Sequence, residues 1–251
     1  MLTPPPLDQL QTLKLSGMYH ALVEQFQMAA IAALSFEERV GLLVDRELTE
    51  RDHRRLTTRL RQAQLRQTAC IADLDSRPPR GLAKAVMARL ASCQGVRERH
   101  KVLITGPTGI GTTWLGCALG HQACREGWTA LERRLPRFLQ AVPSATGDGR
   151  CRHLRPTLAK TDWLMLDDWG LAPLRDAHRR DVLEIVEERH DCRSTLVPRQ
   201  FPVEHGPEAL GDPTLADAIL DRLVHNAYKI PLQGDSRRKR QARLTRGATA
   251  D

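Results

Sequence analysis

The chain has 251 residues, of which 41% are hydrophobic and 27% charged, which is typical of a globular protein and excludes a disordered or membrane-embedded chain. This length suffices for one α/β domain and a smaller appendage, since single cores rarely exceed about 250–300 residues. The 38 basic and 30 acidic residues give a net charge of +8, which favours a polyanionic partner such as nucleic acid. A solvated basic surface would carry the same charge, so both interpretations stay open.

The cysteines and the N-terminus indicate the compartment. None of the 6 cysteines forms a C-x-x-C pair, so their spacing predicts neither a zinc site nor a disulfide framework, and we expect buried, free thiols. The segment from Met1 to Asp8 lacks a basic stretch followed by an apolar one, and no apolar run reaches the length of a membrane span. We therefore expect a cytoplasmic protein without a membrane segment.

Residues 1–76 are predicted to form a small helical domain. Apolar residues from Leu7 to Phe26 recur at helical spacing, which indicates one amphipathic helix or two short ones. Ser35, followed by Glu37 and Glu38, is typical of an N-cap with an acidic first turn, so another helix is expected to begin there. The proline-containing segment 77–81 then separates this domain from residues 77–251.

The helix after Ser35 is predicted to continue to residue 66 with a strongly basic face. Asp52 is the one acidic residue between positions 51 and 66, so local ion pairs cannot neutralise the arginines there. A solvated helix face is the alternative to contact with DNA phosphates. The arginines predicted to contact DNA are Arg51, Arg54, Arg55, Arg59 and Arg61. A second basic cluster, 236–243, is predicted to be a mobile tail or a further phosphate-binding segment.

Residues 77–251 are predicted to form an α/β domain of the P-loop type. Short β-rich runs alternate with helical stretches, which predicts a parallel sheet flanked by helices on both faces. The runs expected to be strands are 102–105, 129–131, 163–167, 194–197 and 228–232.

A glycine-rich loop follows the first predicted strand and precedes a helix. It matches the Walker A pattern G-x-x-x-x-G-K-[ST] except that Thr112 replaces the lysine. Such a turn points backbone N–H groups and the positive helix end at a phosphate, so it is predicted to bind ATP; the alternative is an ordinary strand-to-helix turn. The predicted nucleotide-binding residues are Gly106, Pro107, Thr108, Gly109, Ile110, Gly111, Thr112 and Thr113.

Two acidic residues close the apolar run 163–167 in the manner of a Walker B strand. Asp167 is expected to hold Mg²⁺ together with the Thr113 hydroxyl, and Asp168 to orient the attacking water as a catalytic residue. A helix N-cap is the alternative for either carboxylate alone. Two consecutive acids after an apolar strand favour the metal.

Two longer strings resemble the IstB-like transposition helper ATPases of bacterial insertion sequences: residues 166–173, Leu-Asp-Asp-Trp-Gly-Leu-Ala-Pro, and residues 211–228. Stretches 15–18 and 34–39 also fit, so the resemblance spans nearly the whole chain. It implies an AAA+ ATPase related to the helicase loader DnaC. Such a protein assembles as a homo-oligomer on double-stranded DNA, binds ATP and Mg²⁺ between subunits, and recruits or stimulates a partner transposase.

The resemblance also implies a sensor of the γ-phosphate after the fourth strand, where this chain has Gln200. Pro198 and Arg199 stand where the family has small hydroxylated residues. Because proline cannot donate to a sheet ladder, Pro198 is expected to shorten this strand and displace the sensor.

A further implied role is that of Arg222, at the position where relatives carry an arginine that reaches the neighbouring subunit's nucleotide. A salt bridge to Asp217 or Asp221 is the alternative. His225 and Asn226 follow in the same helix, where a packing role is expected and no chemistry is assigned.

Thr112 decides what kind of activity the sequence predicts. Losing one charge-assisted hydrogen bond costs about 1.5–3 kcal/mol, or about 10- to 100-fold in affinity, so ATP binding is expected to survive. Hydrolysis also needs the lysine's charge in the transition state, so turnover is expected to be very low or absent. An accessory protein of transposition is the favoured function; a nucleotide-independent DNA-binding scaffold and a DnaC-like helicase loader remain alternatives.

Overall fold

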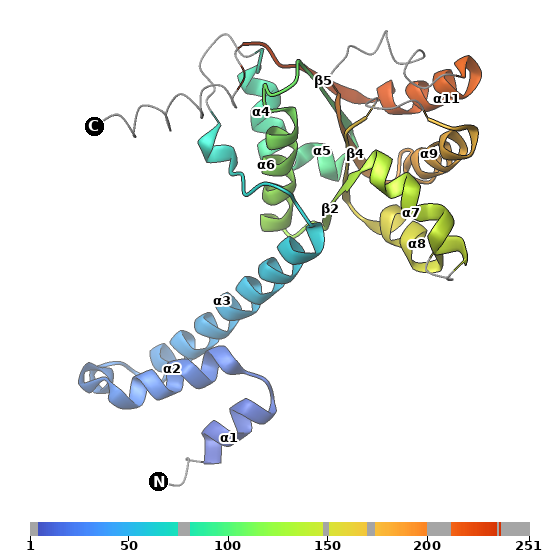
Figure 1. Ribbon diagram of the computed structural model, residues 1–251. Helices are drawn as coiled ribbons and strands as arrows, with labels where there is room; N and C mark the ends of the chain where they lie inside the picture. The colour runs from blue at the N-terminus through green and yellow to red at the C-terminus, as the bar shows by residue number, and fades with distance from the viewer. Residues whose placement is uncertain are drawn as a thin grey trace, which may run out of the picture. The chain divides into compact units, whose positions relative to one another are not determined.

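The computed structural model of the protein describes residues 5–74, 81–147, 151–169, 174–199, 212–234 and 236 (Figure 1). The chain divides into two compact units, residues 1–58 and 59–251. The second unit therefore begins within the segment that the sequence assigns to the N-terminal domain. Among the described residues, no helix is long and apolar enough to cross a membrane.

The first unit is helical, and two short helices, rather than one, cover its first part. Its elements are α1 (Pro5–Thr12), α2 (Ser16–Gln27), the 3₁₀ helix η1 (Ala29–Ala33) and most of α3 (Phe36–Ala63). The N-cap predicted at Ser35 is confirmed: its hydroxyl accepts the N–H of Glu38 at 3.2 Å, and the Glu38 carboxylate accepts the N–H of Ser35 at 2.8 Å. This reciprocal pair satisfies two backbone donors that a helix start leaves unpaired.

A buried carboxylate on α3 holds the start of α2. Glu47 accepts the N–H groups of Gly17 at 2.8 Å and Met18 at 3.2 Å. Only glycine allows this approach, because a Cβ at position 17 would lie 2.6 Å from the Glu47 Cα. Burial pushes the pKa of Glu47 upward, but the hydrogen bonds from Arg51, Met18 and Gly17 outweigh it and lower the pKa.

The second unit is an α/β fold, as predicted from the alternating pattern. Its elements in chain order are η2 (Ile71–Asp73), α4 (Lys84–Ala91), α5 (Gln94–Arg97), β1 (Lys101–Thr105), α6 (Thr112–Arg125), β2 (Ala130–Arg134), α7 (Leu135–Gly147), α8 (Cys151–Lys160), β3 (Trp163–Asp167), α9 (Asp176–Arg189), β4 (Ser194–Arg199), α11 (Pro213–Val224) and β5 (Ala227–Pro231).

The five strands form one sheet in the order β2-β3-β4-β1-β5, and every neighbouring pair is parallel. Figure 1 shows α4 and α6 on one face, with α7, α8, α9 and α11 on the other. All five predicted strands are present, although β2 continues three residues beyond its predicted end at 131. Because the strands are parallel, their carboxyl ends lie along one edge, where α/β folds bind ligands.

Apolar side chains from the strands and from both helix layers fill the core. β3 and β4 are buried along their whole length. On the α6 side the backbones approach closely, because a Cβ at Gly116 would lie 2.8 Å from the Met165 side chain. The core thus fixes α6, and with it the loop that precedes α6, against the carboxyl edge of the sheet.

Pro198 does not shorten β4, contrary to the prediction. The strand runs to Arg199, and Pro198 is paired with Ile104 of β1. The Arg199 carbonyl accepts the N–H of Gly106, which directly follows β1. Backbone polar groups alternate in direction along a strand, so the Pro198 nitrogen points towards the other neighbour, β3. The regular ladder with β3 ends at Leu196, and the isolated bridge beyond it joins Trp169 to Arg199, so the proline lies between the two and interrupts neither.

Candidate functional site

The glycine-rich loop lies at the carboxyl end of β1 and leads into α6. Gly109 and Gly111 have φ angles of 85° and 111°, in the left-handed region that glycine adopts without strain. Gly111 is the N-cap of α6, and no side chain caps this helix. The N–H groups of Thr112 and Thr113, the first two residues of α6, therefore lie where an anion could accept them.

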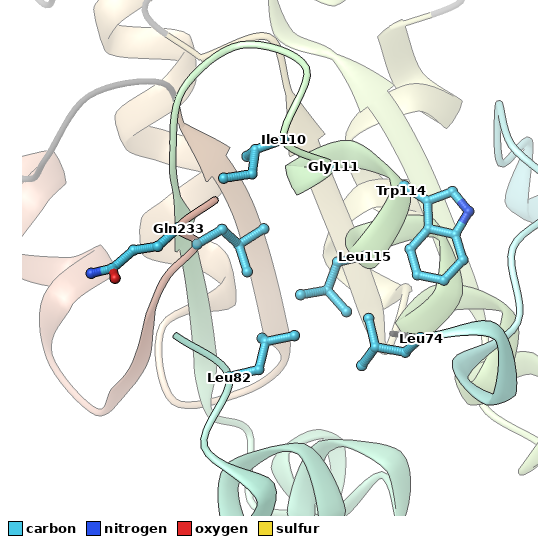
Figure 2. Close-up of a pocket in the computed structure, with 8 residues that line it drawn as sticks. Leu74, Leu82, Ile110, Gly111, Trp114, Leu115 and Gln233 are labelled. Carbon is cyan, nitrogen blue, oxygen red and sulfur yellow. The ribbon is translucent and has the colours of Figure 1, made fainter. Parts of the chain in front are cut away.

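An apolar pocket adjoins this loop (Figure 2). Ile110 and Gly111 of the loop form one part of its wall. Leu74 and Leu82 form another, although they flank a segment that the sequence indicates only as a linker. The remaining lining residues are Trp114, Leu115, Leu232 and Gln233. The lining is apolar with one amide, but the cavity measures only about 10 Å³, so these side chains would have to move apart before the ring of a base could enter.

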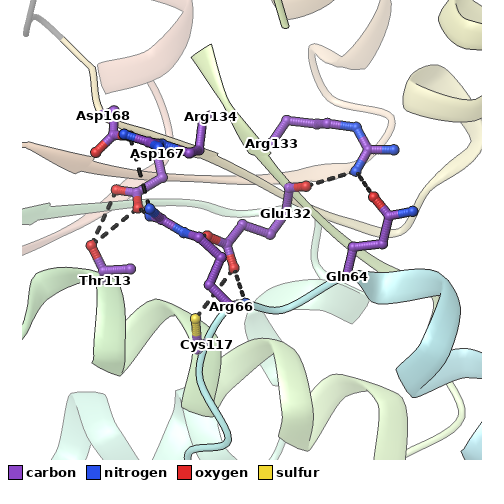
Figure 3. Close-up of polar contacts among 9 residues, drawn as sticks. All are labelled: Gln64, Arg66, Thr113, Cys117, Glu132, Arg133, Arg134, Asp167 and Asp168. Carbon is purple, nitrogen blue, oxygen red and sulfur yellow. Dashed lines mark hydrogen bonds and ion pairs between the residues drawn. The ribbon is translucent and has the colours of Figure 1, made fainter. Parts of the chain in front are cut away.

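The hydroxyl of Thr113 and the carboxylate of Asp167 meet at the same edge of the sheet (Figure 3). The hydroxyl lies 3.2 Å from Oδ1 and 3.1 Å from Oδ2, and the Asp167 side chain is buried. α6 contributes the hydroxyl and β3 the carboxylate. Two hard oxygen ligands next to a phosphate loop form the donor set that Mg²⁺ prefers, so these residues fit that ion.

Arg66 joins this site, although the sequence places it on the basic face of a helix. α3 ends at Ala63 and Gln64 has a φ of 52°, so Arg66 lies beyond the helix. Its guanidinium forms an ion pair with Asp167, and its Nε lies 2.5 Å from the buried carboxylate of Glu132 (Figure 3). The Arg66 N–H also donates to Glu132, at 2.8 Å. Sequence reasoning missed both Arg66 and Glu132.

Asp168 is bound by arginine as well. Arg134, the last residue of β2, donates to its carboxylate, and Arg66 lies 3.9 Å away. Asp168 has a φ of 60°, an uncommon conformation for a residue other than glycine and one that concentrates at functional sites. The carboxylate expected to orient water is thus held by an ion pair from β2.

A thiol lies beneath the carboxylates. Cys117 of α6 donates from Sγ to Glu132 at 3.4 Å. Burial and the neighbouring Glu132 charge raise the pKa of Cys117 to about 12. As expected, Cys93, Cys117 and Cys124 are free and buried. Cys70 and Cys192 are also free, and Cys192 is exposed.

Comparison with known proteins decides the family. The sequence model of the IstB-like ATP binding protein family matches residues 8–245. The chain belongs to this family. It is 45% identical over 243 residues to an insertion sequence ATP-binding protein of Sinorhizobium fredii, covering 97% of this chain and 99% of the relative. It is also 49% identical over 207 residues to the IS1162 ATP-binding protein of Pseudomonas fluorescens, covering 82% of this chain and 90% of the relative.

Solved structures agree on the fold of this IstB-like protein. DnaI superposes with a TM-score of 0.59 at 21% identity, covering 67% of this chain and 92% of DnaI. The DnaC helicase loader gives 0.54 at 16%, covering 64% and 97% respectively. At these identities the likeness establishes the fold, which is that of AAA+ P-loop domains, as the sequence predicted.

The predicted DNA-binding arginines of this IstB-like chain are more fully paired than the sequence indicated. Arg51 and Arg54 lie 2.6 and 3.8 Å from Glu47, which precedes residues 51–66 in the same helix. Arg55 lies 3.5 Å from Asp52. These three arginines share two carboxylates, so pairing lowers the positive charge of this face without neutralising it, and the three side chains remain 45–67% exposed.

In the second unit, Arg59 is committed to a structural bond, since its Nε donates to the Cys124 carbonyl at 2.8 Å. Arg61 is exposed in the last turn of α3. The basic cluster 236–243 lies outside the described residues except for Ser236, which is half-buried. Of the predicted phosphate-binding arginines, Arg61 is therefore the one for which the described residues provide neither an ion pair nor a side-chain hydrogen bond.

Arg222 forms an ion pair with Glu187 of α9 and is 29% exposed. The salt bridge considered as the alternative to a trans-acting role thus exists, but with Glu187 rather than with Asp217 or Asp221. An arginine that reaches a neighbouring subunit from this position must first leave Glu187. Gln200, the expected phosphate sensor, lies outside the described residues.

A second polar cluster lies at the amino edge of the sheet. Ligand atoms of His190, Asp191 and His225 lie within 4.8 Å of one another. Lys101, the buried first residue of β1, has its Nζ 3.2 Å from Asp191 and 3.4 Å from His190. The lysine ammonium already supplies this cluster with a cation. The cluster is therefore consistent with the structural role expected of His225.

Proposed function

We propose that the protein is an ATP-binding accessory protein of DNA transposition. In this role it binds double-stranded DNA as a homo-oligomer and recruits or stimulates a partner transposase. The observation that carries the nucleotide-binding part is the glycine loop before α6, a helix without a side-chain N-cap, next to the Thr113–Asp167 pair. The transposition part is supported by the relatives, which are named as insertion sequence ATP-binding proteins.

Each part of the nucleotide has a matching surface. Backbone N–H groups of Gly111, Thr112 and Thr113 would bind the phosphates. The apolar pocket beside Ile110 and Trp114, with a cavity of about 10 Å³, would take the base once its side chains move apart. Thr113 and Asp167 would hold Mg²⁺, which neutralises phosphate charge when bound. Affinity can therefore survive the substitution at Thr112.

Hydrolysis is impaired in this proposal. Thr112 places no charge against the transferring phosphate, and Asp168, which would orient water, is paired with Arg134. Arg222 could act on a neighbouring subunit's nucleotide only after leaving Glu187. The protein would then work mainly through the nucleotide-bound state.

The test is binding and hydrolysis of ATP by the full chain and by Thr112→Lys. We expect the fluorescent analogue mant-ATP to bind the unchanged chain with Mg²⁺ and to bind Thr112→Lys at least as tightly, with a gain of at most about 10- to 100-fold. Thr112→Ala, which also lacks a charge, is the matched control and should behave like the unchanged chain. Rapid hydrolysis that Thr112→Lys fails to increase would contradict impaired catalysis, and absence of mant-ATP binding would contradict nucleotide binding.

Basic side chains of α3 would contact DNA, and exposed apolar side chains would contact a protein partner. Arg61 and the half-exposed arginines of α3 suit phosphate contact, in which case DNA affinity falls steeply with salt. The described part of residues 1–58 also exposes nine large apolar side chains to solvent, and such a surface suits contact with a protein partner. These are Leu13, Phe26, Met28, Leu34, Phe36, Val40, Leu42, Val44 and Leu48.

A nucleotide-independent DNA-binding scaffold is the second candidate, favoured by the ion pair that already occupies Asp167. Sedimentation of the chain with duplex DNA separates the two. A size distribution that shifts with ATP and Mg²⁺ supports the accessory ATP-binding protein, and one that is indifferent to them supports the scaffold. A helicase loader would instead bind a replicative helicase and not the transposase.

A further inference from the structure

We infer that Arg66 supplies the positive charge that Thr112 lacks, by binding the nucleotide's phosphates from outside the glycine loop. This inference rests on the proposed nucleotide-binding function and deepens it. A phosphate chain on the loop needs a fixed cation beside the backbone N–H groups, because N–H groups carry only partial charge. The loop itself offers none, since residues 106–113 contain no basic side chain.

The position of Arg66 is set by oxygen atoms of the site. Asp167 Oδ2 accepts the Thr113 hydroxyl at 3.1 Å and also pairs with the Arg66 Nη2. The guanidinium is therefore separated from the first turn of α6 by a single shared oxygen. A phosphate bound at that turn would lie next to the guanidinium, which can hold two phosphate oxygens at once.

The other basic side chains around the site are engaged elsewhere. Arg134 donates to Asp168, and Arg133 donates to Gln64 at 2.7 Å and to the Glu132 carbonyl. Within the described part of the chain, Arg66 is the basic residue paired with Asp167. Long-range packing thus brings a cation to the phosphate site from 46 residues before Thr112.

Arg66 is also built to change partner without leaving the site. Nε is held by Glu132, whereas Nη2 is held by Asp167, so the two contacts use different nitrogens. The Arg66 side chain is 37% exposed, while those of Glu132 and Asp167 are only 2% and 4% exposed. With Asp167 and Thr113 engaged by Mg²⁺, Nη2 can turn to a phosphate oxygen while Nε stays on Glu132.

The experiment measures Mg²⁺-dependent mant-ATP binding to four full-length variants: Arg66→Gln, Arg66→Lys, Arg66→Gln with Thr112→Lys, and Arg125→Gln. We expect Arg66→Gln to bind about 10- to 100-fold more weakly than the unchanged chain, and Arg66→Lys to retain most of the affinity. Thr112→Lys should restore binding to Arg66→Gln, which loss of a purely structural arginine would not allow. Arg125→Gln removes the same charge from the exposed far end of α6 and should change nothing.

Two outcomes would overturn the inference. Equal or tighter binding by Arg66→Gln would mean that Arg66 is dispensable or blocks the site, and failure of Thr112→Lys to restore binding would mean that Arg66 acts structurally. If the unchanged chain does not bind mant-ATP, the proposed function falls and the inference with it. Thermal unfolding is followed in parallel, and if Arg66→Gln unfolds at the assay temperature, Arg66→Gln with Glu132→Gln removes an unpaired buried acid and takes its place.

Discussion

Each edge of the sheet holds a cluster of ion pairs, but the acid is buried at one edge and the cation at the other. At the carboxyl edge the acids are buried, with Asp167 4% exposed, and the cation Arg66 is 37% exposed. At the amino edge the cation is buried, with Lys101 3% exposed, and the acid Asp191 is 61% exposed. A buried acid with a cation accessible from solvent can exchange that cation for a metal or ligand. A buried cation with an exposed acid cannot be exchanged in this way without unfolding the edge.

Backbone dipoles reinforce the difference. Helices α9 and α11 end at the C-caps His190 and His225, so their negative ends lie by Lys101 and stabilise its charge. At the carboxyl edge α6 begins, and its positive end favours an anion. At the amino edge, the charge of Lys101 is therefore already compensated within the fold. The carboxyl edge is instead complementary to a phosphate.

The largest effect is expected from Arg66→Met. It leaves the buried carboxylates of Glu132 and Asp167 without their common cation, and breaking a buried pair in this way costs about 3–5 kcal/mol of unfolding free energy. Urea unfolding at neutral pH measures the loss. Adding Glu132→Met removes one orphaned charge and should recover part of it. A loss below about 1 kcal/mol would mean that the carboxyl-edge acids do not depend on Arg66.

Thiol labelling sharpens the contrast, because each edge carries a cysteine. Cys192 is exposed in the turn before β4, at the amino edge, whereas Cys117 lies under Glu132. A pKa of about 12 for Cys117 leaves about a thousandfold less thiolate at pH 8 than an ordinary thiol has. We expect dithionitrobenzoate to modify Cys192 rapidly and Cys117 only on unfolding, as followed by peptide mass mapping. Equal rates in the folded protein would contradict the burial of the carboxyl edge.

The smallest effect is expected from Lys101→Met. Removing a buried charge offsets the loss of its pair, so the unfolding free energy should fall by less than about a quarter of the loss in Arg66→Met. The hydrogen bond from Lys101 holds the pKa of Asp191 below its ordinary 3.8. A lowered pKa adds stability above pH 3.8 that is lost as pH falls through the folded value. In Lys101→Met the pKa of Asp191, measured by NMR, should rise towards 3.8, with His190 and His225 still lowering it. An unchanged pKa would show that Lys101 does not act on it.

Local patterns were sufficient to predict most of the fold. Apolar runs bounded by polar residues gave all five strands, and Ser35 with Glu38 gave the start of α3. The glycine loop and the acids after β3 could be recognised because their spacing along the chain is fixed by one strand and one turn. Both Thr113 and Asp167 were found in this way, and the structure brings them together.

The other half of the site depends on contacts between distant residues. The predicted strand ended at residue 131, before the charged Glu132 and Arg134, whereas pairing with β3 keeps these residues in β2. Glu132 is buried there because Arg66, 66 residues earlier, supplies its counter-charge. Pro198 was misjudged for a related reason, since its effect depends on which neighbouring strand its nitrogen faces. A periodicity analysis contains neither kind of information.

The left-handed backbone of Asp168, with its φ of 60°, limits which side chains this position tolerates. Aspartate and asparagine accept that conformation readily, while a β-branched residue such as valine would strain the turn by about 1–2 kcal/mol. Asparagine matches aspartate in shape but carries no charge for Arg134. Asp168→Asn therefore removes the charge while keeping the geometry of the turn, so the two contributions of this position can be separated by one substitution.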